Sequence, residues 1–236
     1  MIRAIVVDDE IHARDELSAM LVETGAFEVV AGCGHAIEAL KALKAERPEV
    51  MFLDIRMPGL SGFELLSMID EEIMPTVVFV TAYDEYALRA FEENAVDYLL
   101  KPIEPERLKK TVQKLNKMAR QSSRPLYPPA PIGRIPCVSG QRIRLISLTD
   151  IDFVRSDVAG VYVVTSEGEY FTELTLKVLE ARTNLVRCHK QFLVNIDRVD
   201  EILLQENQAA QIRMSDGKVA PVSRRYLKRM KDQFGF

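Results

Sequence analysis

The chain has 236 residues, of which 47% are hydrophobic and 28% charged, and its formal net charge is -4 at pH 7. This size and balance fit two modest globular domains, each with its own apolar core. No apolar stretch reaches the roughly 18 residues that a membrane span needs, and residues 1–3 run into a strand-like segment without a secretory signal pattern. We therefore expect a cytoplasmic protein with no membrane insertion. The three cysteines form no CxxC pair and indicate reduced structural thiols: Cys33, Cys137 and Cys188.

Charge is divided unequally along the chain. Residues 1–118 hold 13 Lys and Arg against 22 Asp and Glu, whereas residues 119–236 hold 18 against 13. A basic carboxyl-terminal half indicates an anionic partner such as nucleic acid. Between the halves, residues 121–133 contain four prolines and cannot continue a helix. We therefore predict a semi-rigid linker at 119–131, between one domain at 1–118 and another at 132–236.

The first half alternates apolar, strand-like runs with helical patterns. The apolar runs are Ile2 to Val7, Glu28 to Ala31, Val50 to Leu53, Thr76 to Val80 and Val96 to Leu100. The helical patterns are His12 to Glu23, His35 to Glu46, Phe63 to Ile69 and Pro105 to Met118. Because strands that alternate with helices pair in parallel, we expect an α/β domain with a parallel sheet and crossover helices.

Charged and polar side chains follow the ends of these runs. Asp8 and Asp9 follow the first, Asp54 the third, and Thr81 and Lys101 the last two. The carboxyl ends of parallel strands meet at one edge of a sheet, so these groups should converge. Clustered carboxylates suit Mg²⁺, an aspartate can attack phosphorus, and an ammonium and a hydroxyl can hold phosphoryl oxygens. Adjacent aspartates alone are typical of helix caps, but the whole set predicts a site that takes up a phosphoryl group.

The sequence also suggests how phosphorylation could cause side chains to move. A Thr81 hydroxyl drawn toward a new phosphoryl group leaves space that a neighbouring side chain can fill. Tyr98, three residues before Lys101, is the predicted neighbour, although simple packing at a strand end is the alternative.

Four motifs in the first half carry a resemblance to a known family. Residues 1–118 closely resemble the receiver domain of bacterial two-component response regulators through Val6-Val-Asp-Asp-Glu10, Leu53-Asp-Ile-Arg-Met-Pro-Gly59, Val80-Thr-Ala82 and Asp97-Tyr-Leu-Leu-Lys-Pro102. The resemblance implies a flavodoxin-like (βα)5 fold and phosphotransfer from a sensor histidine kinase to Asp54. It also implies Mg²⁺ held by Asp9 and Asp54 with Asp8 assisting, and by the backbone carbonyl of Arg56. A cis peptide bond before Pro102 is implied as well.

The second half is predicted to be rich in β-structure. Short apolar or alternating runs are separated by turn residues, at Ile143 to Ile146, Ile151 to Val154, Val161 to Thr165, Val186 to Cys188, Ile202 to Leu204 and Gln211 to Met214. Ser215-Asp-Gly-Lys218 predicts a hairpin turn, because Asp-Gly accepts positive φ angles. Only Leu174 to Arg182 and Ser223 to Gln233 have helical patterns. The last of these carries five basic residues, which suit DNA phosphates but also a solvated helix face.

Three segments of this half are similar to the LytTR DNA-binding domain, over residues 132–236. They are Phe171-Thr-Glu-Leu-Thr-Leu-Lys177, Val186-Arg-Cys-His-Lys-Gln-Phe-Leu-Val-Asn195 and Ala220-Pro-Val-Ser-Arg-Arg-Tyr-Leu-Lys228. The resemblance implies a mainly-β fold that inserts loops into the major groove of double-stranded DNA at direct-repeat sites. The family's base-reading residues fall on Ser156 to Gly160, Cys188 to Lys190 and Ser223 to Arg225.

Individual roles follow from this placement. Lys190 and Arg225 are the leading base contacts, because both can donate to guanine and Arg can do so bidentately. Arg187 and Lys228 are expected to contact phosphates, which position a protein without reading sequence. The second and third loops also hold a histidine, a serine and an arginine that we assign to the DNA surface: His189, Ser223 and Arg224.

These features together predict a two-component response regulator that controls transcription, by resemblance as an activator, and that forms a homodimer on phosphorylation. Arg56 and Tyr83 each lie two residues after a site residue, so we expect them to shield the acyl phosphate from water. We expect no enzyme, because an aspartyl-phosphate hydrolase needs a second acid that Asp54-Ile-Arg56 does not provide. An adaptor whose β-domain binds protein or RNA is the other alternative, although RNA-binding outputs of the antiterminator type are helical by resemblance.

Overall fold

The computed structural model describes residues 1–121, 127, 130–140, 142–204 and 210–234. These residues form two compact units, Met1–Pro129 and Ala130–Phe236. The division falls within the segment for which the sequence predicts a linker. None of the described helices combines the length and the apolar character that crossing a bilayer requires.

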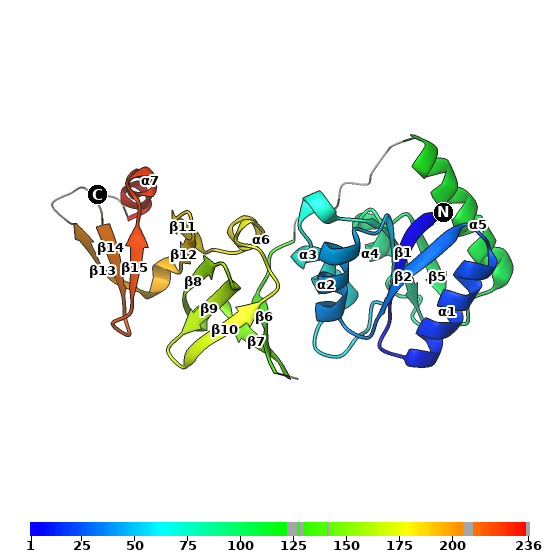
Figure 1. Ribbon diagram of the computed structural model, residues 1–236, viewed down its shortest axis with the longest axis horizontal. Helices are drawn as coiled ribbons and strands as arrows, with labels where there is room; N and C mark the ends of the chain where they lie inside the picture. Colours follow the sequence, from blue (N-terminus) through cyan, green and yellow to red (C-terminus); the bar gives the residue numbers. More distant parts are fainter. Residues whose placement is uncertain (122–126, 128–129, 141, 205–209, 235–236) are drawn as a thin grey trace. The chain divides into compact units, whose positions relative to one another are not determined.

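The first unit is built on a five-stranded parallel sheet in the order β2-β1-β3-β4-β5. Its strands are β1 (Ile2–Val7), β2 (Phe27–Cys33), β3 (Val50–Leu53), β4 (Thr76–Thr81) and β5 (Asp97–Leu100). Its helices are α1 (Ile11–Glu23), α2 (Ala36–Glu46), α3 (Gly62–Met68), α4 (Ala87–Glu92) and α5 (Pro105–Gln121). Figure 1 shows α1 and α5 on one face of the sheet and α2 and α3 on the other. The parallel α/β fold predicted from the sequence is therefore confirmed, with α5 continuing three residues past its predicted end.

Two helices close one face of this sheet with a continuous apolar core. Leu108 and Leu115 of α5 are buried with Leu17 and Leu21 of α1 against the strands, including Val80 of β4. The spacing of the apolar residues in α5 matches the predicted helical stripe. Because both faces are covered, β3 is buried along its whole length.

The chain beyond α5 contacts this unit again at Tyr127. The Tyr127 side chain is only 8% exposed, and its hydroxyl accepts a hydrogen bond of 2.7 Å from the backbone N–H of Val77 in β4. Burial raises the pKa of Tyr127 far above its usual range. Tyr127 is therefore attached to the first unit.

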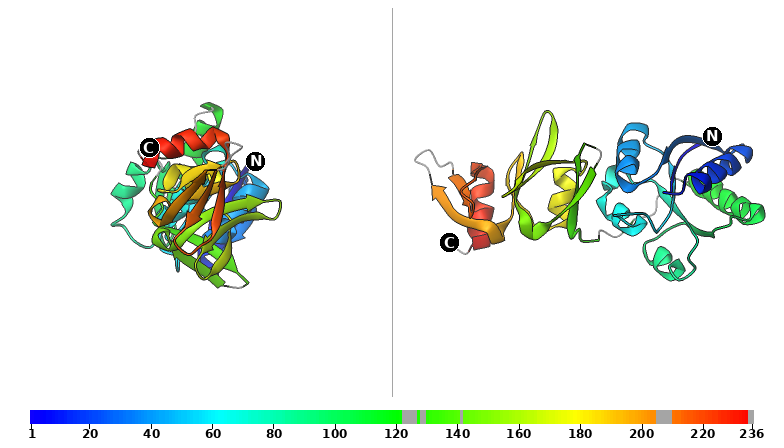
Figure 2. Two further views of the ribbon diagram at one scale, coloured as in Figure 1. Left: turned by 90° about the vertical axis from the view of Figure 1, so that its left-hand side faces the viewer. Right: turned by 90° about the horizontal axis from the view of Figure 1, so that it is seen from below.

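The second unit contains two antiparallel sheets. The larger has the order β11-β12-β8-β9-β10-β6-β7 and the smaller β13-β14-β15. The larger sheet holds β6 (Arg134–Ser139), β7 (Arg142–Ser147), β8 (Ile151–Asp157), β9 (Gly160–Thr165), β10 (Gly168–Thr172), β11 (Val186–His189) and β12 (Phe192–Val194). The smaller holds β13 (Val199–Leu204), β14 (Ala210–Met214) and β15 (Val219–Val222). The helices are α6 (Leu176–Arg182) and α7 (Arg224–Phe234), and Figures 1 and 2 show α7 against the smaller sheet.

The predicted hairpin is present between β14 and β15, where Gly217 has a φ of 86°. The sequence prediction did not include β6, β10 and β12, and β6 has a clear physical reason. It contains Pro136, which cannot donate a ladder hydrogen bond. Its ladder with β10 is limited to the pair Phe171 and Val138, and the Pro136 carbonyl instead accepts the Thr172 hydroxyl at 2.8 Å.

The two sheets of the second unit are joined by apolar packing and by one buried carboxylate. Phe153 and Val164 of the larger sheet pack in one core with Ile212 and Val222 of the smaller sheet. Asp152 on β8 is fully buried.

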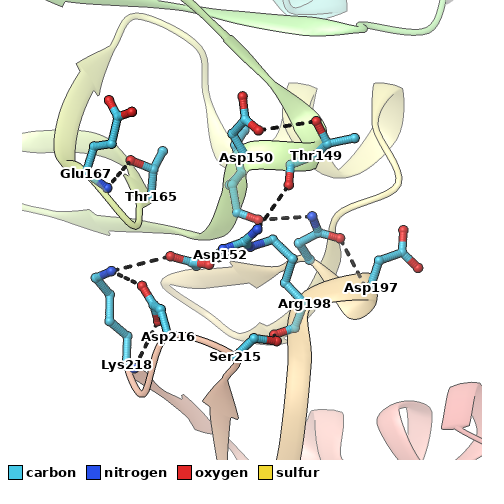
Figure 3. Close-up of polar contacts among 12 residues, drawn as sticks. Thr149, Asp150, Asp152, Thr165, Glu167, Asp197, Arg198, Ser215, Asp216 and Lys218 are labelled. Atoms are coloured by element: carbon cyan, nitrogen blue, oxygen red, sulfur yellow. Dashed lines mark hydrogen bonds and ion pairs between the residues drawn. The ribbon is translucent and has the colours of Figure 1, made fainter.

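Figure 3 shows Arg198 and Lys218 reaching this carboxylate, with Asp216 beside Lys218. The Asp152 carboxylate accepts the Arg198 Nε at 2.7 Å and lies 3.5 Å from the Lys218 Nζ. Arg198 ends the short helix η3 (Ile196–Arg198), and Lys218 lies in the turn before β15. This network fixes the smaller sheet, and α7 with it, against β8.

Candidate functional site

The first candidate site lies at the carboxyl edge of the parallel sheet. The Lys101 Nζ is 2.7 Å from an Asp8 carboxylate oxygen and 2.9 Å from an Asp54 carboxylate oxygen. Asp8 and Asp54 are 2% and 6% exposed, whereas Asp9 is exposed. Carboxylate oxygens of the three aspartates lie within 4.8 Å of one another. The structure thus brings together the residues that the sequence predicted to converge.

The sheet and the turns around it determine this geometry. The Asp54 N–H donates to the Val7 carbonyl at 2.8 Å, which places the end of β3 beside the end of β1. The peptide bond between Lys101 and Pro102 is cis, as the family resemblance implied. The start of α3 lies so close that a Cβ on Gly62 would come 2.4 Å from the Asp54 carbonyl oxygen. Only glycine fits there.

The charges of this site are not balanced. Burial raises the pKa of Asp8, although the Lys101 ammonium and the Glu10 N–H oppose that rise. Burial alone would lower the pKa of Lys101, but its two carboxylate partners outweigh burial and raise it. Asp8 and Asp54 therefore share one ammonium, and the Asp9 carboxylate lies within 4.8 Å of them without a cation of its own among the described residues. Oxygen donors with excess negative charge are the ligand set that a hard divalent cation such as Mg²⁺ prefers.

Among the described residues, Thr81 has the one buried side-chain oxygen or nitrogen atom that makes no hydrogen bond. Its Oγ1 is fully buried and has no hydrogen-bond partner among the described residues. Its carbonyl accepts the Lys101 N–H at 2.9 Å, so the hydroxyl lies on the strand next to the Lys101 position. An unsatisfied buried hydroxyl costs about 1–3 kcal/mol. The Thr81 hydroxyl can therefore donate to an acceptor that the described residues do not supply.

Tyr98 is held in a buried position beside this strand. It pairs in register with Phe79 of β4, two residues before Thr81, and its hydroxyl donates to the Tyr83 carbonyl. Burial, with nearby acidic groups, raises the pKa of Tyr98 to about 12. Tyr98 is thus fastened to the segment that follows Thr81.

Arg56 and two tyrosines form an exposed cluster next to Asp54. The Arg56 guanidinium carbon lies 4.1 Å from the centre of the Tyr83 ring, and its Nη2 is 3.0 Å from the Tyr86 hydroxyl. The backbone N–H of Arg56 donates a hydrogen bond of 3.3 Å to an Asp54 carboxylate oxygen. The pair that the sequence predicted as a shield is therefore assembled as one stacked unit.

The second candidate site is one edge of the β-rich unit, where the three predicted DNA loops meet. The Ser156 N–H donates to the Gln191 carbonyl at 2.9 Å, which joins the first loop to the second. The Ser223 N–H donates to the Cys188 carbonyl at 3.0 Å, which joins the second to the third. Loops separated by more than 60 residues in sequence therefore form a continuous surface.

Four basic side chains on this edge are exposed: Lys190, Arg224, Arg225 and Lys228. Across the described ranges, no acidic side chain pairs with any of them. Unpaired cations on one edge are the electrostatic footprint of a nucleic-acid surface.

Two residues that the sequence places on the DNA surface also make contacts within the unit. The Arg187 Nε is 2.8 Å from a Glu180 carboxylate oxygen, and its Nη1 donates to the Lys190 carbonyl at 3.2 Å. The His189 Nδ1 accepts the Gln191 N–H at 3.2 Å, and burial with the nearby Lys190 charge lowers the pKa of His189. Both side chains therefore hold the turn that carries Lys190.

Sequence reasoning missed the buried Asp152 and its partners, which position this edge. A signal was present, because Asp152 interrupts the otherwise apolar run Ile151 to Val154. A carboxylate buried within an apolar strand needs a cationic partner, but the sequence does not reveal which basic residue supplies it.

Known proteins match both units. Residues 4–113 match the response regulator receiver domain, and residues 141–235 match the LytTr DNA-binding domain. An uncharacterized response regulatory protein of Vibrio cholerae is 51% identical over 237 residues, with both chains covered completely. The transcriptional regulatory protein BtsR of Escherichia coli is 47% identical over 238 residues, again with complete coverage.

The chain belongs to the LytTR family of response regulators. Among solved structures, the response regulatory domain of mrkE from Klebsiella pneumoniae is 34% identical, with a TM-score of 0.46 over 51% of this chain and 99% of that one. As a LytTR response regulator, the chain combines a receiver domain, which implies a sensor kinase, with a DNA-binding domain. This combination is characteristic of transcription regulators, and receiver domains typically bind Mg²⁺ through acidic residues. The family predicted from the sequence motifs is confirmed.

Proposed function

We propose that this regulator accepts a phosphoryl group on Asp54 from a sensor histidine kinase and then binds DNA to control transcription, by family resemblance as an activator. The observation that carries the proposal is the buried Thr81 hydroxyl, which has no hydrogen-bond partner among the described residues and lies on the strand between those that end at Asp54 and Lys101. A phosphoryl group on Asp54 would provide the acceptor oxygens that this hydroxyl lacks.

The transfer step follows from the positions of the side chains. An Asp54 carboxylate oxygen attacks phosphorus, the bond from phosphorus to the kinase histidine nitrogen breaks, and its electron pair leaves with the imidazole. The Lys101 ammonium, already 2.9 Å from Asp54, stabilises the charge on the phosphoryl oxygens. Asp8, Asp9, Asp54 and the Arg56 carbonyl would hold Mg²⁺, which when bound neutralises phosphoryl charge.

The response to the new anion is proposed to run through Thr81 and Tyr98. The Thr81 hydroxyl moves to donate to a phosphoryl oxygen, which opens space next to β4. Tyr98 leaves the Tyr83 carbonyl and fills that space. This change biases the receiver toward a homodimer, which places two DNA-binding units on adjacent direct repeats.

On the DNA edge, we propose that Lys190 and Arg225 read bases while Ser223, Arg224 and Lys228 contribute backbone contacts. Arg187 and His189 are proposed to position the Lys190 turn rather than to touch phosphates. A cytoplasmic location follows from the proposal, because both the kinase's phosphoryl donor and the chromosome are found there.

Phosphoryl incorporation tests the receiver half of this proposal. Purified full-length protein is treated with acetyl phosphate and Mg²⁺, and incorporation is measured by intact-protein mass spectrometry. Asp54→Asn is expected to abolish incorporation. Thr81→Ala is expected to keep incorporation but lose the Tyr98 response, seen as unchanged tyrosine fluorescence. Thr76→Ala, on the same strand at its other end, is the matched control. Equal incorporation in wild type and Asp54→Asn would contradict the proposal.

A further inference from the structure

The tip of the turn between β8 and β9 carries a fully exposed aliphatic side chain, Val158. Val158 has a relative exposure of 109%, the largest of the exposed hydrophobic residues in the described chain. Single exposed apolar residues are common, so exposure alone decides nothing. Val158 is distinguished by its location, because the turn is hydrogen-bonded through Ser156 to the loop that carries Lys190.

The turn is built to hold this tip rigidly. The Asp157 carboxylate accepts the Ala159 N–H at 2.8 Å, and Arg155 pairs with Asp157 while its Nε donates to Glu169 at 3.0 Å. Gly160 has a φ of 139°, and a Cβ there would lie 2.5 Å from the Phe171 ring. Any residue with a side chain would be strained at this φ and would displace the Phe171 ring, so glycine favours this turn, and Val158 is held outward on an ion-paired base.

The charges around the tip argue against a contact with phosphate. Arg155 is the cation at the base of the turn, and it is already shared between the Asp157 and Glu169 carboxylates. The base of the turn therefore has one more negative than positive group, whereas the neighbouring Lys190 loop presents an unpaired cation. The net negative charge at the base disfavours a contact between this turn and phosphate, so the apolar tip is the part of the turn suited to contact DNA, while Lys190 on the neighbouring loop supplies the attraction to it.

The major-groove edges of the base pairs offer one apolar group, the C5-methyl of thymine, and a valine side chain can contact nothing else there favourably. We propose that Val158 is a specificity-determining residue that contacts the C5-methyl group of one thymine in each half-site. This inference rests on the proposed DNA-binding function, because it assigns a role within the same edge. In this proposal the β8–β9 turn recognises a base through an apolar contact, whereas Lys190 and Arg225 on the other two loops recognise bases through hydrogen bonds.

Deoxyuridine substitution tests the contact directly. A duplex is first selected from a random-sequence pool with phosphorylated full-length protein, and each thymine is then replaced in turn by deoxyuridine. This change removes the C5-methyl and leaves every hydrogen-bonding group in place. We expect one thymine per half-site at which the change weakens wild-type binding by about fourfold, which corresponds to one buried methyl group.

Variants of Val158 show whether the effect belongs to this side chain. Val158→Ser is expected to lose sensitivity to deoxyuridine at that position, and Val158→Ile to keep it. Val219→Ser changes another exposed valine of the same unit and should keep the wild-type pattern. Identical deoxyuridine profiles for wild type and Val158→Ser, with specific binding retained, would overturn the inference but leave the proposed function standing. Failure to select any duplex would overturn both.

Discussion

The two candidate sites of this regulator treat charge in opposite ways. At the carboxyl edge of the receiver sheet, Asp8 and Asp54 are buried and share the ammonium of Lys101. At the loop edge of the LytTR unit, basic residues such as Lys190 and Arg225 are exposed without acidic partners among the described residues. The receiver site is therefore assembled before its ligand arrives, whereas the DNA edge depends on its partner for neutralisation. Variants on the two sites should fail in different ways.

The largest effect is expected at Lys101. Lys101→Ala removes the cation that would stabilise the phosphoryl oxygens, and loss of one such donor typically slows a reaction by about 10²–10³-fold. The rate of phosphoryl uptake from acetyl phosphate, followed by mass spectrometry, measures this effect. Lys109→Ala removes an exposed lysine of α5 and should leave the rate unchanged. Equal rates of phosphoryl uptake for Lys101→Ala and this control would show that the ion pair between Lys101 and Asp54 has no part in phosphoryl transfer.

The next effect concerns the buried carboxylate behind the DNA edge. Asp152→Ala leaves Arg198 without its carboxylate partner, while Lys218 keeps Asp216, and leaving one partly buried donor unpaired costs about 1–3 kcal/mol. Urea unfolding of the full-length protein should show this loss in the free energy of unfolding of the LytTR unit. Asp150→Ala alters an exposed acid two residues away and is the control. A change no larger than in the control would mean that packing alone fixes the two sheets.

Smaller effects should separate base reading from phosphate contacts. Lys190→Ala and Arg225→Ala should each weaken binding to the selected duplex by about 1–3 kcal/mol and relax the preference at one base pair. Lys228→Ala should weaken all sequences alike and reduce the slope of log affinity against log salt by about 1. Binding titrations at several salt concentrations distinguish the two patterns. If Arg225→Ala weakened binding to all duplex sequences equally, Arg225 would be assigned to a contact with the DNA backbone rather than with a base.

The smallest effect is expected at the exposed cluster beside Asp54. Arg56→Ala and Tyr83→Ala each break the stacked pair, and the strength of such a contact on a surface predicts about two- to fivefold faster loss of phosphate. The half-life of the phosphorylated protein after removal of acetyl phosphate measures this. Arg89→Ala removes a similar stack on Phe63 and serves as the control. Rapid phosphate loss in wild type, unchanged in both variants, would remove the shielding role.

The same contrast explains how much could be predicted from the sequence. In the receiver, strands buried on both faces are continuous apolar runs, so the positions of Asp54 and Lys101 followed from parallel pairing alone. In the LytTR unit, β6 was missed because Pro136 argues against a strand, and its hydrogen bond to Thr172 depends on tertiary contact. The role of Asp152 also depended on partners distant in sequence, Arg198 and Lys218. Residues fixed by local pattern were predictable, and residues fixed by long-range pairing were not.

The central claim is that phosphorylation of Asp54 controls sequence-specific DNA binding. Its most direct test is selection from a random-sequence duplex pool by full-length wild type and Asp54→Ala, each with acetyl phosphate and Mg²⁺. The account predicts that wild type enriches a direct repeat and that the variant enriches it much more weakly. No enrichment by either protein would contradict the account and favour an adaptor whose β-rich unit binds another protein.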